Sequence, residues 1–403
     1  MGQACIVSGP IVAARTLANR CFLNFHEDYR QHVSVMIPRE AFDKFAAPPE
    51  QLFSNKHVRV SGVITDFQGR LQIVVESPDQ IEVIPAPATQ PSPAPASQPA
   101  PSPDAPASKP AGVARPFTGR VKIATYNVLN LFDAVDDPYH DDEGTPTKPT
   151  NERERVAATI RALDADVLAL QEVENRGVLE AFVAELLPDL GYGHIVLFEG
   201  NDTRGIDVAV LSRLPVGPVT SYRHLKFPRA DGTIASFERD LLRVRIEPPD
   251  ALTFDIFVVH LKSKRGRDGS DDPTLPIRQA EALAVRQVLD DVLSEDPAAR
   301  FLICGDFNDR IDSLPMRTLL GEGERALRTW ATELPAEQCV SYNKEPFRSM
   351  IDFILCSPAL AARFEPGSYA IVAGSVESSG SDHNPVAAMF DLRPNQDSES
   401  LSD

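Results

Sequence analysis

The chain has 403 residues, of which 42% are hydrophobic and 24% are charged, an ordinary globular composition with room for two or three domains. Its formal net charge of −18 disfavours non-specific binding to polyanions, because the long-range field repels phosphate, although a bound divalent cation reverses the sign locally. The five cysteines follow no regular spacing, which excludes a disulfide framework and a zinc motif and leaves one disulfide open.

Residues 1–84 are rich in short strand signals, such as CFLNFH, HVSVMIP and HVRVSGVITDF, with one helical stretch at 39–53. Five or six short strands and one helix in about 80 residues predict a small closed barrel. Three strands, a helix and two further strands are the element order of an OB-fold. The FLNF run and the VRVSGVITDFQGRLQIVV hairpin also resemble the nucleic-acid-binding OB domains of some bacterial nucleases.

Aromatic residues in this region are candidates for base stacking, because OB-folds bind single strands on aromatic rings in a basic groove. The candidates are Phe22, Phe25, Tyr29 and Phe67. Residues 1–84 contain eight basic and nine acidic side chains, a balance that disfavours strand binding. In the alternative interpretation, the rings form the barrel core and the domain binds a protein.

Residues 85–116 form the predicted boundary between two domains. Eleven of these 32 residues are proline, which predicts an extended, semi-rigid linker. A larger domain is expected at 117–394, followed by a disordered acidic tail at 395–403. No run reaches 18 apolar residues, which predicts no membrane span. We expect no signal peptide in this chain, so that secretion or export to a periplasm would require a leader upstream.

Strand and helix signals alternate through residues 117–394, which predicts an α/β domain. Helices are expected from a capping box of Asn151 and Glu154, around 179–187, and at 277–293. Cys304 and Cys356 lie in apolar runs and are predicted to be buried thiols. The expected strands are VKIATYNVL, DVLALQ, HIVLF, IDVAVLS, LLRVRI, TFDIFVVHL, RFLICGD, IDFIL and PVAAMF.

Several of these apolar strands end in a side chain that can bind a metal or a phosphate. IATY is followed by Asn127, VLALQ by Glu172 and FDIFVV by His260, whereas FLIC leads through a glycine to Asp306 and Asn308. Because α/β proteins place their sites at the ends of strands, the repetition predicts a cluster at one edge of a sheet.

Seven motifs in order then resemble the endonuclease/exonuclease/phosphatase superfamily, to which deoxyribonuclease I is related. They cover about 117–392 and read TYNVLNLFD, LQEVEN, RGIDVAVLSR, VVHLKSK, GDFND, IDFIL and SDHNPV. The resemblance implies a two-sheet sandwich flanked by helices, with the active site at one edge.

The resemblance also implies roles for residues of these motifs. Metal binding falls to Asn127, Glu172 and Asp382, with Mg²⁺ as the expected ion and Mn²⁺ or Ca²⁺ as alternatives, because hard cations take oxygen ligands. The implied catalytic residues are His260 and His383 facing the phosphate, Asp306 and Asn308 beside the attacking water, and Asp352 orienting His383. Whether Asp306 or His383 activates the water stays open.

The resemblance further implies that substrate is bound by Arg204, Asp207, Arg239 and Lys262. Salt bridges or surface exposure explain these four residues equally well. The acidic loop at 132–144 is predicted to be a solvated loop, with a second cation site as the alternative.

The sequence therefore predicts a divalent-metal-dependent phosphodiester hydrolase, and specifically a nuclease that cleaves DNA or RNA by in-line attack of water. A nucleic acid is the expected partner, and the oligomeric state is not predicted. The alternative is a phospholipid or sugar-phosphate phosphodiesterase, or a phosphatase, whose N-terminal barrel binds a protein. A catalytically inactive binding protein is disfavoured, because every matched motif position holds a competent residue.

Overall fold

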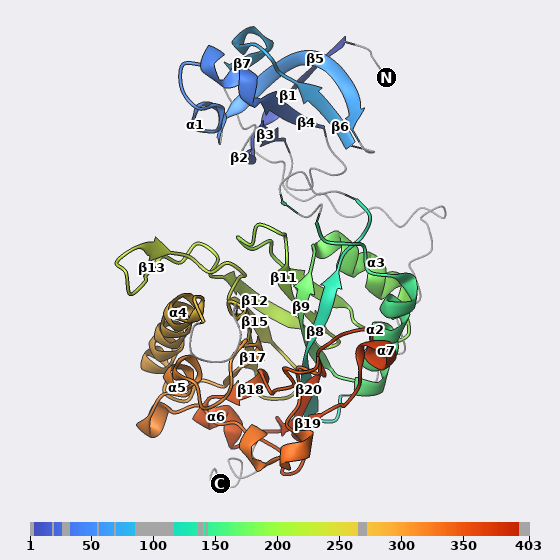
Figure 1. Ribbon diagram of the computed structural model, residues 1–403, viewed down its shortest axis with the longest axis vertical. Coiled ribbons are helices and arrows are strands. Elements are labelled where there is room, and N and C mark those ends of the chain that lie inside the picture. Colours follow the sequence, from blue (N-terminus) through green and yellow to red (C-terminus); the bar gives the residue numbers. More distant parts are fainter. Residues whose placement is uncertain are drawn as a thin grey trace, which may run out of the picture. The chain divides into compact units, whose positions relative to one another are not determined.

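The structure, a computed structural model, describes residues 4–17, 20–25, 33–54, 56–67, 70–84, 117–135, 140–141, 144–264 and 272–394. The chain divides into two compact units, Met1–Pro106 and Ala107–Asp403 (Figure 1). The division falls within the predicted linker, and both this linker and the predicted tail at 395–403 lie outside the described residues.

The N-terminal unit is built on one mainly antiparallel sheet with the strand order β1-β5-β6-β4-β3-β2, in which β7 also pairs with β5. Strands β4 and β6 pair in parallel. The strands are β1 (Ala4–Pro10), β2 (Ala13–Leu17), β3 (Arg20–Asn24), β4 (Ser34–Pro38), β5 (His57–Phe67), β6 (Arg70–Val74) and β7 (Ile81–Ile84). A short 3-10 turn, Pro78–Gln80, precedes β7.

The helix expected at 39–53 is interrupted in the structure. Arg39–Lys44 forms a 3-10 turn, and α1 is a separate short helix at Pro49–Phe53. Pro48 and Pro49 explain the break, because proline has no N–H to donate and disfavours helical dihedrals in the residue before it. The prediction of one continuous helix was therefore wrong.

Buried aliphatic side chains, together with Cys21, Phe42 and Phe53, form the core of this unit. Phe22 is only 1% exposed, and Phe25 is half-buried against the core. Tyr29 and the side chain of Phe67 lie outside the described residues. A stacking role on the surface therefore does not suit Phe22, which agrees with the alternative interpretation for that ring.

The C-terminal unit contains two mixed sheets. The six-stranded sheet has the order β10-β11-β9-β8-β20-β19, and the five-stranded sheet has the order β12-β15-β16-β17-β18. The first comprises β8 (Arg120–Leu131), β9 (Val167–Val173), β10 (His194–Leu197), β11 (Asp207–Ser212), β19 (Ala370–Ile371) and β20 (Val386–Asp391). The second comprises β12 (Val216–Ser221), β15 (Leu242–Ile246), β16 (Phe254–His260), β17 (Phe301–Asp306) and β18 (Asp352–Cys356), and β13 (Phe227–Pro228) pairs with β14 (Ile234–Ala235) beside them.

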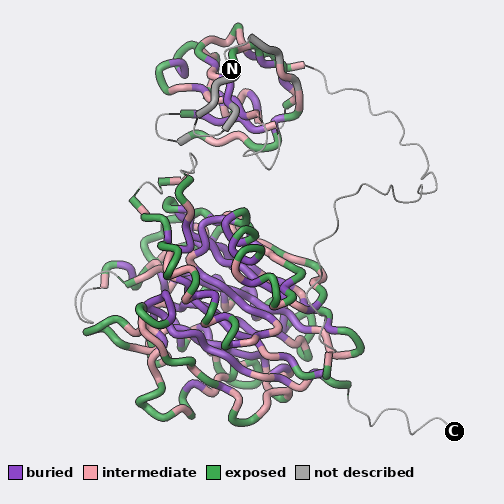
Figure 2. The backbone as a smooth tube through the Cα atoms, turned by 90° about the vertical axis from the view of Figure 1, so that its right-hand side faces the viewer, coloured by how far each residue is buried: buried purple, intermediate pink, exposed green. Residues whose placement is uncertain are grey.

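The two sheets face each other across a shared apolar core and are flanked by helices, which confirms the predicted α/β arrangement. Side chains of both sheets, such as Ile123 and Ile256, belong to this core, whereas a second cluster joins the outer face of the six-stranded sheet to α2 and α3. Figure 1 shows α2 and α3 on one side of the sandwich and α4 and α5 on the other. Figure 2 shows that the buried segments run through the middle of this unit.

The helices of this unit are α2 (Thr150–Leu163), α3 (Arg176–Leu186), α4 (Leu275–Glu295), α5 (Leu314–Leu320), α6 (Pro358–Ala361) and α7 (Val376–Ser379), with 3-10 turns at Gly323–Arg325, Ala331–Glu333 and Ala336–Gln338. The capping box expected from Asn151 and Glu154 does not form. Pro149 precedes the first helical residue, and no side chain caps α2. Because α2 begins at Thr150, Asn151 already has helical dihedrals and cannot act as the N-cap.

Cys304 and Cys356 are buried free thiols, as predicted. No expected strand corresponds to β12, β13, β14 or β19, because their short sequences carry little apolar periodicity. Among the described residues, no helix is long and apolar enough to cross a membrane.

Candidate active site

Three predicted site residues lie in register on neighbouring strands of the five-stranded sheet. His260 at the end of β16 pairs with Asp306 at the end of β17 in the parallel ladder. Asp306 pairs in turn with Asp352, the first residue of the antiparallel strand β18. Because paired residues point to the same face of a sheet, the ladder itself brings two carboxylates and an imidazole to one edge.

This register depends on Gly305. Its φ is +141°, and a Cβ at this position would lie 1.9 Å from the carbonyl oxygen of Val259 on β16. A larger residue would therefore force the two strands apart immediately before His260 and Asp306.

Gly305→Ala is expected to lower the free energy of unfolding of the C-terminal unit by more than about 2 kcal/mol, from the clash and the unfavourable dihedral together. Trp330, the one tryptophan in the chain, stacks on Phe364 in this unit, so tryptophan fluorescence during urea unfolding reports on it selectively. Gly193→Ala is the matched control, because nothing lies within 4 Å of its added Cβ. Equal unfolding midpoints for the two variants would contradict the proposed role of Gly305 in the register of β16 and β17.

Asn127 links the two sheets at the site. It lies on β8, and its Nδ2 donates hydrogen bonds of 3.1 Å to Oε1 of Glu172 and of 3.1 Å to Oδ2 of Asp306. Its Oδ1 accepts a hydrogen bond of 3.0 Å from the backbone nitrogen of Leu129. Asn127 is fully buried. In this arrangement, the amide holds two carboxylates of opposite sheets at a fixed separation.

Glu172 lies at an irregularity in β9. The β9–β11 register shifts at this point, so that Val173 and Gln171 pair with consecutive residues and Glu172 has no partner in the ladder. Its φ is +63°, which is uncommon for a residue with a side chain. Its Oε2 accepts a hydrogen bond from the backbone nitrogen of Asn130, whose own φ is +51°. The bulge therefore aims the carboxylate at the strand ends of the neighbouring sheet.

His383 and Asp352 form a buried hydrogen-bonded pair. Nδ1 of His383 donates to Oδ2 of Asp352 at 2.9 Å. Burial by itself lowers the pKa of His383, but the negative charges of Asp352 and Asp306 outweigh it and raise this pKa. The pair thus fixes the ring orientation and directs Nε2 toward Asp306, whose Oδ2 is 3.8 Å away.

Asp306 lies between the two histidines. Its Oδ2 is 3.6 Å from Nε2 of His260, and its Oδ1 accepts a hydrogen bond of 2.8 Å from the backbone nitrogen of Asn308. Burial and the nearby charge of Asp352 raise the pKa of Asp306, which makes this carboxylate a stronger base. Asn308, with a φ of +51°, donates from Nδ2 to the carbonyl of Leu261.

His260 is almost fully buried, and its Nδ1 has no hydrogen-bond partner in the structure. Burial and the positive charge of Arg239 hold the pKa of His260 well below its ordinary value of 6.5. The imidazole is therefore neutral at neutral pH, in contrast to His383.

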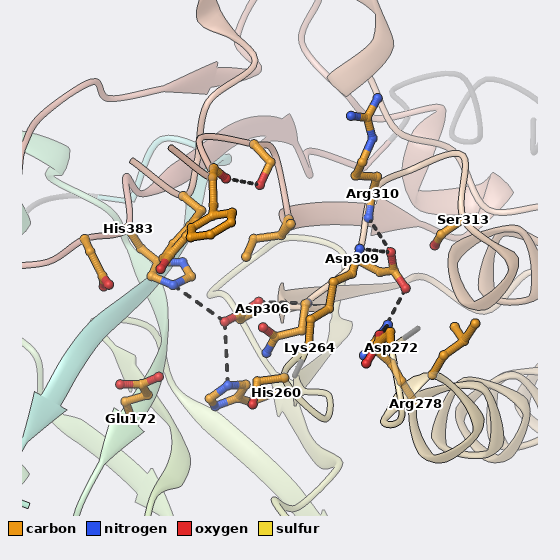
Figure 3. A pocket seen from close by; sticks show the side chains of 18 of the residues that line it. Glu172, His260, Lys264, Asp272, Arg278, Asp306, Asp309, Arg310, Ser313 and His383 are labelled. Carbon is orange, nitrogen blue, oxygen red and sulfur yellow. Dashed lines mark hydrogen bonds and ion pairs between the residues drawn. The ribbon is translucent and has the colours of Figure 1, made fainter. Parts of the chain in front are cut away.

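These side chains border a pocket of about 1000 Å³, which Figure 3 shows from close by. Glu172, His260 and His383 surround Asp306 at one end. Asp382 also lines the pocket, whereas Asn127 lies behind it.

The acidic residues here suit a divalent cation. Oδ1 of Asp382 is buried and has no hydrogen-bond partner in the structure. Burial raises the pKa of Asp382, and the charge of Glu172 raises it further. Buried like charges with an unpartnered oxygen are the environment that a cation with oxygen ligands stabilises. Asp306, Asp352 and His383 also lie within 4.8 Å of one another, but the hydrogen bond between His383 and Asp352 assigns these residues more simply to proton transfer.

Mg²⁺ or Mn²⁺ is expected to raise the melting temperature of the metal-free protein, because an ion that binds the folded state stabilises it by about 2.7 kcal/mol at 100 times its Kd. Glu172→Gln should abolish most of this increase, since it removes the charge of a proposed ligand. Glu185→Gln on α3 is the control, because this exposed carboxylate lies outside the pocket. An unchanged increase in Glu172→Gln would exclude Glu172 as a ligand.

The four predicted substrate-binding residues are placed differently from one another. Arg204 is exposed on the pocket wall, whereas Asp207 is buried on β11 and accepts from the backbone nitrogen of Gly200. Arg239 also borders the pocket, but its guanidinium is 3.0 Å from Asp202. Nζ of Lys262 pairs with Glu238. Substrate binding by the four residues stays a prediction.

Four further residues support the site and were not predicted. Ser381 donates to the carbonyl of Asn127 at 2.7 Å and accepts from the backbone nitrogen of His383 at 3.0 Å. Ser341 accepts from the backbone nitrogen of Asp352, and the ring of Tyr342 lies 5.1 Å from that of His383. Ser381 belongs to the SDHNPV motif and could have been found from it. Ser341 and Tyr342 belong to none of the seven motifs, and neither does Arg278, a residue of helix α4.

The two facing mixed sheets with their flanking helices fit a deoxyribonuclease I-like α/β sandwich. Residues 122–363, more than half of the chain, match the model of the endonuclease/exonuclease/phosphatase family, and the chain belongs to this family. Its members hydrolyse phosphoester bonds and typically depend on a divalent metal. No curated protein sequence matched the chain.

Solved structures of similar fold include the catalytic domain of human nocturnin with a bound sulfate anion, at 17% identity, a TM-score of 0.49, and coverage of 68% of this chain and 95% of that chain. D. rerio TDP2 in complex with a single-strand DNA product matches at 17% identity and a TM-score of 0.45 over 67% and 98%. An endonuclease/exonuclease/phosphatase from Beutenbergia cavernae matches at 22% identity and a TM-score of 0.46 over 68% and 72%. At these identities, the likeness concerns the fold.

Proposed function

We propose that the protein is a divalent-metal-dependent nuclease that hydrolyses phosphodiester bonds by in-line attack of water. The observation that carries this proposal is the placement of Asp306 between His260 and His383, at the end of an open pocket beside Glu172. A base and two imidazoles that face one space can promote the attack of water on a phosphodiester.

In this proposal, Asp306 accepts the proton of the attacking water, because its raised pKa makes it a strong enough base near neutral pH. His383, whose pKa is also raised, keeps its proton and stabilises the negative charge that develops on the phosphate. Neutral His260 contributes a further hydrogen bond to a phosphate oxygen. No covalent intermediate is needed.

Glu172 and Asp382 would hold the cation directly, and Asn127 would contribute to the metal site through Glu172. When bound, Mg²⁺ supplies positive charge that polarises a non-bridging phosphate oxygen and stabilises the leaving group. Asn127 orients Glu172 for this purpose through the hydrogen bond from its amide.

We also propose that the N-terminal unit is an OB-type barrel that holds a nucleic-acid strand near the catalytic unit. Only Ile11 and Val12 separate β1 and β2, which lie at opposite ends of the sheet order. A continuous strand that runs through β1 and β2 would join the two edges of the sheet and close it into a barrel. The parallel pairing of β4 and β6 suits this topology. Tethering would raise the effective concentration of the substrate.

The test is hydrolysis of labelled single- and double-stranded DNA and RNA with Mg²⁺, Mn²⁺, Ca²⁺ or a chelator. We expect cleavage of at least one polymer with a divalent ion and none with the chelator. Turnover of bis-p-nitrophenyl phosphate without cleavage of any polymer would refute the nuclease and favour a lipid or small phosphodiester as substrate.

A further inference from the structure

The pocket extends well beyond the catalytic residues to a second wall that the reaction itself does not use. This second wall includes Phe347 and Arg348 from the loop before β18. It also includes Leu275, the first residue of α4, Leu314, the first residue of α5, and Arg310, which lies shortly before α5. Phe347 is 53% exposed and Leu314 is 52% exposed. Large apolar side chains that stay exposed inside a pocket are available to a ligand.

The loop that carries Phe347 is anchored to the catalytic residues. Tyr342 and Ser349 exchange two backbone hydrogen bonds of 2.8 and 3.0 Å, which close the loop at its base. The backbone nitrogen of Asn343 donates to the carbonyl oxygen of Asp382 at 2.7 Å. The base of the loop is thus fixed relative to Asp382 and His383, and Phe347 lines the same pocket as the catalytic residues.

Basic side chains outnumber acidic ones in this part of the pocket lining, although the chain as a whole has a net charge of −18. Four basic and two acidic side chains line it: Lys264, Arg278, Arg310, Arg348, Asp272 and Asp309. The two carboxylates are already paired with Arg278 and Lys264. Figure 3 shows Arg310 on the side of Asp306 away from His383.

Arg310 and Arg348 are available to bind an anion. Arg310 lies 3.4 Å from Asp312, and Arg348 lies 3.6 Å from Glu345, but in both pairs the two side chains are about half exposed or more. Exposed pairs of this kind contribute little to stability and are readily exchanged.

We propose that the second wall binds one unpaired nucleotide next to the scissile phosphodiester. The ring of Phe347 stacks on the base, and Arg348 and Arg310 pair with the phosphate of that nucleotide. A paired base within a duplex has both faces covered by its neighbours, so the stacking requires a single strand or an unpaired end. An acyl chain would need a continuous apolar lining, which the arginines interrupt. This inference rests on the proposed nuclease function and names its substrate class.

The first test compares Phe347→Ala with wild type on a single-stranded oligonucleotide and on bis-p-nitrophenyl phosphate, which has no base to stack. Phe347→Ala is expected to lower kcat/KM on the oligonucleotide about tenfold, mainly through KM, because base stacking on an aromatic ring is lost. Turnover of the small diester should change less than about twofold, and Phe347→Trp should restore oligonucleotide cleavage. Leu283→Ala, an exposed apolar residue of α4 outside the pocket, is the control.

The second test measures KM for the oligonucleotide against salt concentration. Arg348→Gln should weaken the salt dependence by about 0.7 in the log–log slope, the contribution of one phosphate contact in a single strand. Arg176→Gln on α3 is the exposed control.

These measurements separate failure of the inference from failure of the proposed function. If wild type cleaves the oligonucleotide and Phe347→Ala cleaves it equally well, the second wall does not bind a nucleotide, although the nuclease proposal stands. Equal losses on both substrates would also refute stacking, because they indicate damage to the catalytic residues. Wild type that cleaves only the small diester refutes both proposals.

Discussion

His383→Ala is expected to lower kcat for phosphodiester hydrolysis by about 10²–10⁴-fold, the range for loss of a positioned acid–base group. The hydrogen bond of 2.9 Å to Asp352 and the raised pKa of His383 provide the physical reason, because together they keep an oriented, protonated imidazole beside Asp306. The measurement is steady-state hydrolysis of bis-p-nitrophenyl phosphate with Mg²⁺ or Mn²⁺, since this substrate depends only on the catalytic residues.

A double-substitution experiment sharpens this prediction. Asp352 acts through His383, so Asp352→Asn should lower kcat in the wild-type background but have little further effect in His383→Ala. Independent, multiplicative effects would show that Asp352 has a separate role. His194→Ala is the matched control, because this exposed histidine of β10 lies outside the pocket. Trp330 fluorescence during urea unfolding confirms that each variant is folded.

The strand-end residues could be predicted because their positions follow from local pattern alone. An apolar run that ends in a polar residue fixes where a strand meets its loop, and the parallel ladder then places His260 beside Asp306. The conformation of Glu172 could not be predicted in this way. Its positive φ and the register shift in β9 depend on pairing with β11, a contact that no local pattern specifies.

The burial of charged side chains could not be predicted from the sequence pattern either. Arg278 and Glu281 in α4 are only 1% and 2% exposed. Helical periodicity assigns charged side chains to the solvent face, so neither residue gave a signal. In the structure, Glu281 accepts from the backbone nitrogen of Lys262, and burial raises the pKa of Glu281 to about 7. Helix α4 therefore supports the loop after β16 through polar contacts as well as through its apolar face.

In the N-terminal unit, the strands could be predicted better than the helix or the placement of the aromatic rings. Short strands could be predicted from alternation and turn residues, but seven strands form rather than the expected five or six. The helix expected at 39–53 is broken at Pro48 and Pro49. Apolar periodicity also does not distinguish a ring in the core from one on the surface. Phe22 is buried on the face of β3 opposite to Cys21 and Leu23, which are also buried, so both faces of this strand are covered.

Arg278→Met is expected to lower the free energy of unfolding of the C-terminal unit by about 3–5 kcal/mol, because it removes the buried guanidinium that binds both Asp309 and Asp272. Nε of Arg278 donates to Asp309 at 2.9 Å, Nη2 donates to Asp272 at 2.6 Å, and Nη1 donates to the carbonyl of Lys262 at 3.0 Å. The guanidinium thus joins α4, the loop after β16 and the loop after β17 (Figure 3). Arg176→Met is the control, because its pair with Glu180 on α3 is exposed and should cost less than about 1 kcal/mol.

The loss of unfolding free energy in Arg278→Met should also depend on pH, in a direction that the pKa of Asp272 determines. Burial tends to raise the pKa of Asp272, but the hydrogen bonds from Arg278 and Thr274 lower it from its ordinary value of 3.8 to about 2. A carboxyl group whose pKa is depressed on folding adds stability above its unfolded pKa, and this stability is lost as the pH falls through the folded value. The difference between wild type and Arg278→Met, measured by urea unfolding with Trp330 fluorescence, should therefore be largest above about pH 4 and decrease toward pH 2. A difference that stayed constant over this range would show that Arg278 stabilises the unit through packing rather than through its charge.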